Sequence, residues 1–409
     1  MNSIFYLILI ILVSSFVIER ILDALNLRSL KPELPLLVAE RYDKEKYAQS
    51  QLYKKETSKF GLLVSGFHFV LIMVFIISGG FGWLNDLVAG ISKSEIIQAL
   101  LFFGIFGFFF DILGIPFDLY STFVIEEKFG FNKTTPRTFV LDKLKGWLIT
   151  AIIGGGILAL LVWIYEKTGS WFWLIAWGAV TLFTVFMSLF YSDLIVPLFN
   201  KQKPLGEGDL RAAIKDFAMK TGFSIKEIFE IDGSKRSTKA NAYFTGLGRK
   251  KRIVLYDTLI NDLAINEIVA VLAHEIGHNK KKHVTIGLIL GIIQTGILLF
   301  LLSFFLENQN FAEALGANQA AFHLSVLVFG ILFTPLSMII GLFMNQLSRR
   351  NEYQADAFAS NKGMAEGLAS GLIKLSEKNL SNLTPHPAYV FVHYSHPTLL
   401  QRLEKLKSK

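Results

Sequence analysis

Residues 271–306 read VLAHEIGHNKKKHVTIGLILGIIQTGILLFLLSFFL and combine a histidine pair with a long apolar segment. Two histidines bracket a glutamate, three lysines follow, and then more than twenty almost wholly apolar residues run on without a break. A helix needs about 20 apolar residues to cross roughly 30 Å of hydrocarbon at about 1.5 Å per residue. The stretch therefore predicts a membrane-spanning helix with two histidines at its edge.

The composition of the whole chain indicates an integral membrane protein. Of its 409 residues, 52% are hydrophobic and 37 are phenylalanine, and the mean hydropathy is +0.45. This is too apolar for an ordinary soluble enzyme. The leading MNS carries no positive charge and no small-residue cleavage site follows, so we expect a retained span and not a removed signal peptide. The sequence predicts seven spans, at 3–18, 60–84, 96–117, 147–165, 171–191, 284–306 and 322–344.

Lysine and arginine predict the orientation of these spans, because positively charged loops stay on the cytosolic side. They crowd the segments after spans one, three, five and seven, whereas the opposite loops carry at most one lysine each. We therefore expect the N-terminus outside and the C-terminus in the cytosol. The net charge of +8 is explained by these flanks, and no basic stripe interleaved with aromatic residues predicts a nucleic-acid partner. The absence of cysteine excludes disulfides and thiol catalysis.

This topology divides the chain into four parts. We expect spans one to five within residues 1–191, a cytosolic domain at 192–283, spans six and seven at 284–344, and a cytosolic C-terminal part at 345–409. Within the cytosolic domain, LRAAIKDFAMKTG has helical apolar spacing. KEIFEID, NAYFTGL and RIVLYD are strand-like, the last two joined by a turn at GRKK. The predicted fold class is an all-α polytopic membrane protein with a small α+β cytosolic domain.

His274, Glu275 and His278 form an HExxH motif. Positions four apart on a helix lie about 40° apart around its axis, so both histidines project from one face within reach of a single ion. Glu275 lies beside them on the next face. The spacing is the signature of zincin metalloproteases. The alternative is a pair of surface histidines on a charged helix.

A catalytic zinc ion usually has three protein ligands and one open position, so a third ligand is required. Glu352 and Asp356 lie four apart on the helix that continues from span seven. A short outer loop joins spans six and seven, which should pack antiparallel and bring this helix beside the histidine pair. We therefore predict His274, His278 and Glu352 as ligands of one zinc ion per chain, a donor set that suits zinc better than calcium or magnesium. His283, about 140° around the helix from His278, is expected to be an interfacial residue.

Further motifs carry a family resemblance. LAHEIGH and NEYQAD occur together with FDLYSTFVIEEKFGFNKTT (117–135), VPLFNKQKPLGEG and YSHPTLLQRL (394–403). In this combination the chain resembles the type I CAAX prenyl proteases, which are integral membrane zinc metalloendopeptidases, from about residue 35 to the C-terminus. The resemblance implies seven helices that enclose a large chamber capped by a zincin-like catalytic domain. It also implies cytosolic cleavage of proteins that end in a prenylated cysteine followed by three residues.

The expected mechanism follows from zinc chemistry. A zinc ion would lower the pKa of its bound water to near 7 and polarise the scissile carbonyl. Glu275 is expected to take the proton from this water as general base and to pass it to the leaving amine. Asp356 is expected to accept the far ring N–H of a ligand histidine, as a matching aspartate of the family implies.

The resemblance also implies residues that contact the substrate. Asn241 and Ala242 match a family motif that lies along an extended peptide, which can add to a sheet edge. Asn241 is expected to bond this peptide through its side chain, and a turn-capping role is its alternative. His396 matches a family histidine that donates to the oxyanion. Arg402 is expected to pair with an acidic neighbour, in a structural or an electrostatic role.

The residues leave three classes of function open. The first is an endopeptidase that acts on peptides or proteins at the bilayer. Its substrates are either prenylated or are misfolded membrane proteins. The second is a transporter or channel with a regulatory metal site, and the third is a catalytically silent scaffold. The expected location is a bacterial inner membrane or the endoplasmic reticulum. His68, Asp111 and Gln294 lie within predicted spans, where they either face a hydrated chamber or bond a neighbouring helix.

Overall fold

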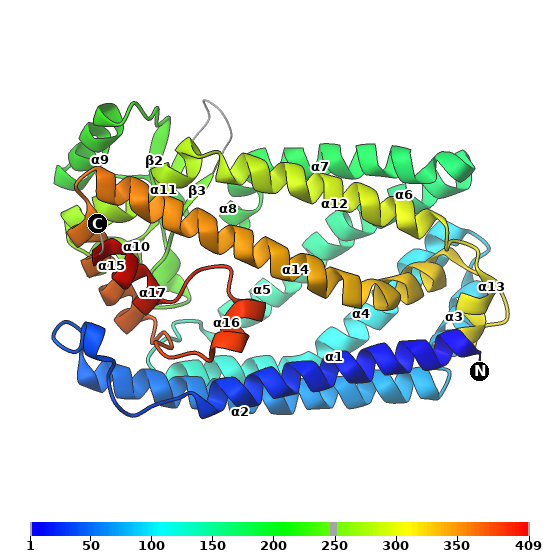
Figure 1. Ribbon diagram of the computed structural model, residues 1–409. Helices are drawn as coiled ribbons and strands as arrows, with labels where there is room; N and C mark the ends of the chain where they lie inside the picture. Colours follow the sequence, from blue (N-terminus) through cyan, green and yellow to red (C-terminus); the bar gives the residue numbers. More distant parts are fainter. Residues whose placement is uncertain (1, 246–251, 408–409) are drawn as a thin grey trace.

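The computed structural model describes residues 2–245 and 252–407, so the predicted turn at 248–251 lies outside the described residues. Long helices run side by side, and the sheet and the C-terminus lie at the end opposite the N-terminus (Figure 1). The helices are α1 (Ser3–Arg28), α2 (Lys44–Ile77), α3 (Gly80–Ile91), α4 (Glu95–Tyr120), α5 (Pro136–Ile149), α6 (Gly155–Thr168), α7 (Phe172–Leu194), α8 (Val196–Phe199), α9 (Asp209–Lys220), α10 (Asp257–Asp262), α11 (Ile265–Lys280), α12 (His283–Ser303), α13 (Gln309–Ala314), α14 (Phe322–Asn361), α15 (Ala365–Lys378), α16 (Pro387–His393) and α17 (Leu399–Lys407). The strands are β1 (Gln202–Pro204), β2 (Glu227–Ile231), β3 (Ala242–Thr245) and β4 (Arg252–Tyr256).

Among the described residues, six helical segments are long and apolar enough to cross a membrane. They are Ser3–Arg28, Lys44–Ile77, Glu95–Glu126, Pro136–Phe199, His283–Ser303 and Phe322–Asn361. The fourth is 64 residues long and contains two of the predicted spans, 147–165 and 171–191. Gly169, at φ 51°, divides it, and α6 turns back there to pack against α7. This φ is one that glycine adopts at little steric cost.

The predicted span at 60–84 extends too far at its C-terminal end. Helix α2 begins at Lys44 and stops at Ile77, and Gly79, at φ 73°, starts the separate helix α3. The polar residues before position 60 continue the same helix beyond its apolar part, because a helix is not obliged to end where hydrocarbon ends. The pair Gly79 and Gly80 breaks it inside an apolar run, which hydropathy alone does not detect.

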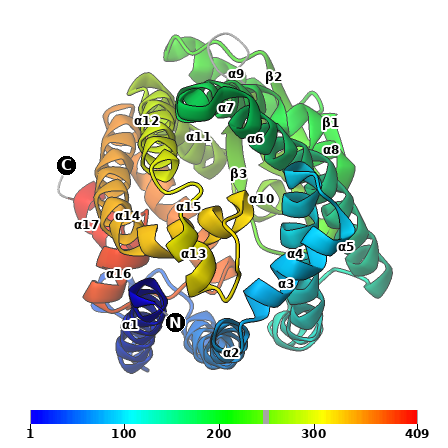
Figure 2. The ribbon, with the colours of Figure 1, turned by 90° about the vertical axis from the view of Figure 1, so that its right-hand side faces the viewer.

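The long helices form a ring when viewed from the N-terminal end (Figure 2). A cluster of buried apolar residues, including Phe81, Phe102, Phe172, Phe311 and Phe322, joins the helices at this end. Between the ends, packing is sparse: in the most apolar part of each candidate span only 6–11% of the residues are buried. The helices are therefore held together at their ends more than along their lengths.

The opposite end contains a four-stranded sheet in the order β1-β2-β4-β3. β2 and β4 are parallel, whereas β1 pairs antiparallel with β2 and β3 antiparallel with β4. Helices α9, α10, α11 and α15 contribute to one apolar core with this sheet. Among the described residues β3 has one neighbour within the sheet, so its other edge is unpaired there.

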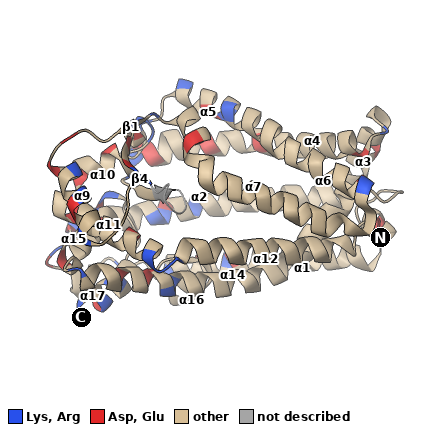
Figure 3. Ribbon diagram, turned by 90° about the horizontal axis from the view of Figure 1, so that it is seen from above, with Lys and Arg blue, Asp and Glu red and all other residues tan. Residues whose placement is uncertain are grey.

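Charged residues gather at the end that holds the sheet and the C-terminus, while the middle of most long helices carries few (Figure 3). Ion pairs tie this end to the membrane helices. In one of them Arg236 donates through Nε and Nη2 to the carboxylate of Asp142 in α5, at 2.7 and 2.8 Å. A two-pronged bond of this kind fixes both distance and orientation.

Candidate metal centre

The site lies where α11 crosses α14. Ile268, Leu272 and Ile276 of α11 recur every four residues and are buried in the apolar core. This leaves the neighbouring stripe, which includes His274, facing α14. At the crossing, a Cβ built on Gly277 would lie 3.0 Å from the Cα of Ala355. The small residue at 277 therefore permits the close approach of the two helices.

His274, His278 and Glu352 converge at this crossing, with one potential ligand atom from each within 4.8 Å of the others. The two Nε2 atoms of the histidines are 3.1 Å apart. The carboxylate of Glu352 lies 3.4 Å from Nε2 of His274 and 3.1 Å from Nε2 of His278. The three side chains that the sequence predicts as ligands are thus brought to one point by two helices.

The donor set fits a metal ion. Glu352 is only 3% exposed, yet its Oε2 atom has no hydrogen-bond partner among the described residues. A buried carboxylate oxygen without a partner is costly, and a cation at this point would satisfy it. Two imidazole nitrogens and one carboxylate are a ligand set of catalytic zinc sites that keep a fourth position open.

Asp356 and Arg402 hold the first of the two histidines. The ring Nδ1 of His274 lies 2.7 Å from Oδ1 of Asp356, and Arg402 donates to both oxygens of Asp356 at 2.6 and 2.9 Å. Arg402 also approaches His274 Nδ1 at 3.3 Å. Because this nitrogen carries the proton that it donates to Asp356, the shorter contact is the hydrogen bond. Its far nitrogen, Nε2, is thereby left as an acceptor that faces Glu352.

These contacts shift the pKa values of both cations. Burial alone would lower the pKa of His274, but the nearby carboxylates of Asp356 and Glu352 outweigh burial and raise it. Burial would likewise lower the pKa of Arg402, and the bonds to Asp356 raise it. The carboxylates around His274 and Arg402 therefore favour the protonated form of each side chain.

The expected placement of His283, about 140° from His278 around one helix, is wrong. His283 is 7% exposed, its Nδ1 lies 3.0 Å from Nδ1 of His278, and its Nε2 lies 3.2 Å from Oε1 of Gln354. The prediction assumed one continuous helix, but α11 ends at Lys280 and Lys282 takes a left-handed φ of 60°. The chain therefore bends, and His283 returns to the histidine that precedes it.

Glu275 and His396 border the metal centre from different elements. Glu275 follows His274 on α11 and is half-buried, and within the part of the chain that the structure describes its carboxylate forms no hydrogen bond. The ring Nε2 of His396, in the loop before α17, lies 3.4 Å from Oε1 of Glu352. Its side chain is 63% exposed. Both groups are therefore accessible to a ligand.

Asn241 and Ala242 lie at the start of the edge strand. Asn241 is exposed, and its Oδ1 accepts from the backbone N–H of Ala242 at 2.8 Å. Ala242 is opposite Leu255 of β4. The capping contact occupies the oxygen of Asn241 and leaves its amide N–H groups for another partner. Both interpretations of Asn241 from the sequence are therefore compatible with its position.

The polar residues inside the predicted spans have different surroundings. Asp111 of α4 accepts from Lys143 at 3.0 Å and from the indole of Trp147 at 2.8 Å, both on α5. His68 bonds the carbonyl of Val64, one turn earlier in its own helix, at 2.9 Å. Gln294 is half-buried. Asp111 thus bonds a neighbouring helix, whereas His68 bonds its own.

Comparisons with known proteins agree with this geometry. Residues 23–201 match the family model described as CAAX prenyl protease N-terminal, five membrane helices, and residues 204–409 match Peptidase family M48. The probable CAAX prenyl protease 1 of Schizosaccharomyces pombe is 35% identical over 391 residues, covering 92% of this chain and 82% of that protein. The CAAX prenyl protease 1 homolog of Arabidopsis thaliana is 35% identical over 404 residues, covering 96% and 94%.

Similarity extends to a solved structure. The crystal structure of S. mikatae Ste24p superposes with a TM-score of 0.93 at 34% identity, covering 99% of both chains. The His-His-Glu cluster, the apolar helices and the two adjoining family matches all lie within this shared fold. The protein therefore belongs to the CAAX prenyl protease family of M48 metallopeptidases.

Proposed function

We propose that this protein is a zinc-dependent endopeptidase that removes the last three residues from prenylated CAAX C-termini at the cytosolic membrane face. The observation that carries the proposal is the convergence of His274, His278 and Glu352 on one point, with Glu275 directly beside them and without a hydrogen bond to any described residue. A site that only bound a metal would not require Glu275. The names of the relatives supply the substrate class.

His274, His278 and Glu352 would hold the zinc ion through two Nε2 atoms and the Glu352 carboxylate. When bound, zinc acts as a Lewis acid toward the scissile carbonyl and makes water a nucleophile near neutral pH. Among the described residues Oε2 of Glu352 has no hydrogen-bond partner, which supports this assignment.

Glu275 takes the proton of the attacking water and delivers it to the amine that leaves. Its carboxylate is suited to this because it is next to His274 in the chain and no hydrogen bond among the described residues ties it down. His396 donates through Nε2 to the oxyanion that develops on the former carbonyl oxygen. Its proximity to Glu352, at 3.4 Å, supports that role.

Asp356 and Arg402 position the metal ligands. Asp356 fixes the tautomer of His274 by accepting from Nδ1 at 2.7 Å, so that Nε2 is free for the metal. Arg402 neutralises Asp356 and lies 3.7 Å from Oε2 of Glu352 through Nη1. The single positive charge of Arg402 thus offsets part of the negative charge of the two buried carboxylates.

The substrate adds as an extended strand to the open edge of β3, where Asn241 and Ala242 lie. Its main chain bonds the strand, and the amide of Asn241 donates to a peptide carbonyl. The position of β3 at the end of the strand order β1-β2-β4-β3 supports this binding mode, since an edge strand exposes unpaired N–H and C=O groups.

The membrane part has seven spans that surround a hydrated chamber, with α6 and α7 as separate spans. The sharp turn at Gly169 supports this count, and the low burial of the span windows supports the chamber. The sheet, Glu352 and the C-terminus face the cytosol, because lysine and arginine gather at that end (Figure 3). The four parts 1–191, 192–283, 284–344 and 345–409 follow from this topology.

A second candidate is a quality-control protease that cleaves membrane proteins without a prenyl requirement. The same zinc site would serve it, so the peptide and not the metal distinguishes the two. A transporter or a silent scaffold is not favoured, because the family of the chain consists of peptidases.

The test uses purified protein in detergent, as wild type and as Glu275→Gln. Zinc is measured by elemental analysis, and cleavage is measured with a farnesylated CAAX peptide and its unmodified counterpart. We expect close to one zinc per chain in both proteins and cleavage of the farnesylated peptide by wild type alone. Equal cleavage of both peptides would favour the quality-control function. Zinc-free protein that cleaves, or Glu275→Gln that retains full activity, would contradict the mechanism.

A further inference from the structure

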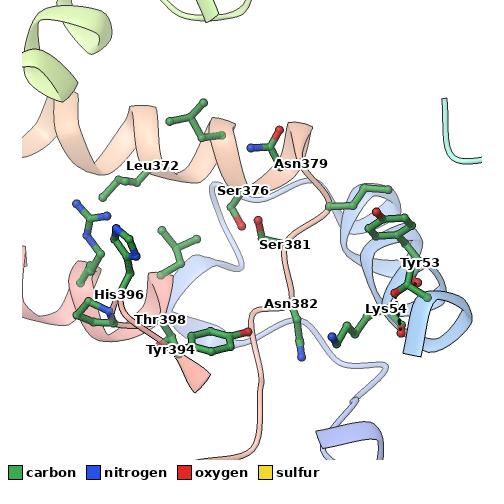
Figure 4. Close-up of a pocket in the computed structure, with 16 residues that line it drawn as sticks. Tyr53, Lys54, Leu372, Ser376, Asn379, Ser381, Asn382, Tyr394, His396 and Thr398 are labelled. Carbon is green, nitrogen blue, oxygen red and sulfur yellow. Dashed lines mark hydrogen bonds between the residues drawn. The ribbon is translucent and has the colours of Figure 1, made fainter. Parts of the chain in front are cut away.

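A cavity of about 580 Å³ adjoins the metal centre and is shared by α2, α15, α17 and two loops. His396 and Arg402 contribute to its wall. In Figure 4, His396 lies at one end of the cavity, and Lys54 and Asn382 lie at the other. A cavity of this size is in the range that binds small ligands. Two residues of its wall, His396 and Arg402, belong to the metal centre described above.

The far end of this cavity presents a cation without a counter-ion. Lys54 of α2 is half-buried, and no carboxylate lies within 4 Å of its Nζ among the described residues. Its nearest ring contact is Tyr389, 5.6 Å from Nζ to the ring centroid. Asp23, the acidic residue that acts on Lys54 at longer range, is already paired with Arg20 at 2.9 Å. Lys54 is therefore available to an anionic ligand.

A second polar group at the same end lacks a partner. The Oδ1 atom of Asn382 accepts from the backbone N–H of Thr384 at 3.0 Å, which assigns the other side-chain atom as the amide nitrogen. That Nδ2 atom is buried and has no hydrogen-bond partner among the described residues. A buried donor without an acceptor is rare in native proteins. Lys54 and Asn382 together offer donors, and no acceptor, to whatever enters.

The cavity also lies beyond the N-terminal end of β3, which is the end that the C-terminus of an antiparallel peptide would reach. Asn379, in its wall, bonds both backbone groups of Ala240, the N–H at 3.1 Å and the C=O at 3.3 Å. A peptide paired antiparallel with β3 runs from Thr245 toward Ala242, so its C-terminal residues pass this point and continue toward Asn379. Antiparallel pairing is the commoner and slightly more stable arrangement.

We propose that this cavity binds the leaving tripeptide and that Lys54 and Asn382 recognise its free C-terminal carboxylate. The inference rests on the proposed function, which puts the scissile bond three residues before the chain end. Three extended residues span about 10 Å, so a peptide whose scissile bond lies at His396 carries its carboxylate deep into the cavity. The recognition of a terminal carboxylate makes the enzyme measure three residues from the chain end, and an internal peptide segment has no group for Lys54.

The test compares full-length protein on farnesylated CAAX peptides that end in a free carboxylate or in an amide. The variants are Lys54→Met, Lys54→Arg and Asn382→Asp, with Lys55→Met on the exposed side of the same helix as control. Asn382→Asp keeps the oxygen that bonds Thr384 but adds a negative charge to the cavity. We expect amidation to lower kcat/KM of wild type by about tenfold to a hundredfold, as for loss of a charge-assisted hydrogen bond.

In Lys54→Met and Asn382→Asp, kcat/KM for the peptide with a free carboxylate should fall by a similar factor. Neither variant should then prefer this peptide over the amidated one. Lys54→Arg should retain most of the preference, and Lys55→Met should behave as wild type. Wild type that cleaves acid and amide equally would overturn the carboxylate site while leaving the peptidase intact. Loss of activity on both peptides by Lys54→Met, with the acid preference unchanged, would also overturn it.

Direct binding separates this inference from the proposed function. The tripeptide Val-Ile-Met and its amide are titrated into the Glu275→Gln protein, in which no turnover occurs. Selective binding of the acid that is lost in Lys54→Met supports the site even if no CAAX peptide is cleaved. Equal binding of acid and amide overturns it. Displacement of the tripeptide by an equal concentration of inorganic phosphate would indicate a general anion site and would overturn the peptide assignment.

Discussion

Gly277 of α11 lies against Ala355 of α14 so closely that a Cβ on Gly277 would come within 3.0 Å of the Ala355 Cα and 3.1 Å of its carbonyl oxygen. The contact is three residues after His274 and three residues after Glu352. The distance between the two helices at this point thus determines how closely the ligands from α11 approach the ligand from α14.

Gly277→Ala should weaken metal binding. The added methyl meets backbone atoms, which cannot rotate away, so the helices must separate at a cost of about 1–3 kcal/mol. We expect about a tenfold rise in the zinc dissociation constant together with a lower thermal unfolding temperature. Gly287→Ala on α12 is the matched control, because a Cβ there meets nothing within 4 Å. Normal zinc affinity in Gly277→Ala would show that the crossing tolerates expansion.

His283 and Gln354 should determine the metal affinity of His278. Since Oε1 of Gln354 accepts from Nε2 of His283, the Nδ1 of His283 is left to accept from His278, whose Nε2 then faces the metal. Loss of a bond of this kind typically costs about tenfold to a hundredfold in metal affinity. We expect this loss for Gln354→Leu and His283→Phe but not for Gln354→Glu, which keeps an oxygen acceptor.

The measurement is competition for zinc with a chelator of known affinity. His68→Phe serves as control, since His68 bonds only the carbonyl of Val64 within its own helix. Equal zinc affinity in Gln354→Leu and Gln354→Glu would contradict the proposed hydrogen-bond chain and leave His283 with a packing role.

Local sequence periodicity predicted the parts of the site that lie on one helix. His274 and His278 follow from four-residue spacing, and Glu352 follows from the antiparallel return of a neighbouring helix, because hydrocarbon thickness restricts where a span can begin and end. His283 was misplaced because the left-handed turn at Lys282 is made by a lysine and not by glycine or asparagine. Composition gives no signal for such a turn.

The two residues at the far end of the cavity were beyond prediction. Lys54 and Asn382 are more than 300 residues apart, and neither belongs to a motif. Asn382 is assigned a special role only because its amide is buried without a partner, which is a property of packing and not of residue type. The span at 60–84 was misjudged because the break at Gly79 depends on backbone conformation, which residue type alone does not show.

Acid should destabilise the protein through Glu267, at the start of α11. Burial would raise the pKa of Glu267, but bonds from Lys374, Ser370 and the Ala264 N–H lower it below its ordinary value of 4.5. A carboxyl group whose pKa is lowered on folding stabilises the protein above its unfolded-state pKa, and this contribution is lost as pH falls through the folded-state pKa. The loss is therefore expected below about pH 4.5.

The measurement is thermal unfolding of chelator-treated protein in detergent between pH 8 and pH 3, for wild type and Glu267→Gln. The difference between them should stay constant from pH 8 to about pH 5 and shrink below that. Metal is removed so that titration of the histidine ligands changes the unfolding temperature of wild type and of Glu267→Gln in the same way. A difference that is unchanged down to pH 3 would show that Glu267 remains ionised throughout or contributes nothing by its charge.

Arg402→Met should be strongly destabilising, because it leaves Asp356 as a buried carboxylate without its main counter-ion. Asp356 is 1% exposed, and removal of one partner from a buried ion pair costs about 3–5 kcal/mol. Arg402→Lys should lose less stability than Arg402→Met but should remain less stable than wild type. An ammonium group cannot donate to both carboxylate oxygens at once as the guanidinium does. The double variant Arg402→Met with Asp356→Asn removes both charges and should be more stable than Arg402→Met alone. Thermal unfolding of wild type, Arg402→Met, Asp356→Asn and the double variant forms a mutant cycle, and additive effects of the two substitutions would contradict a direct coupling between Arg402 and Asp356.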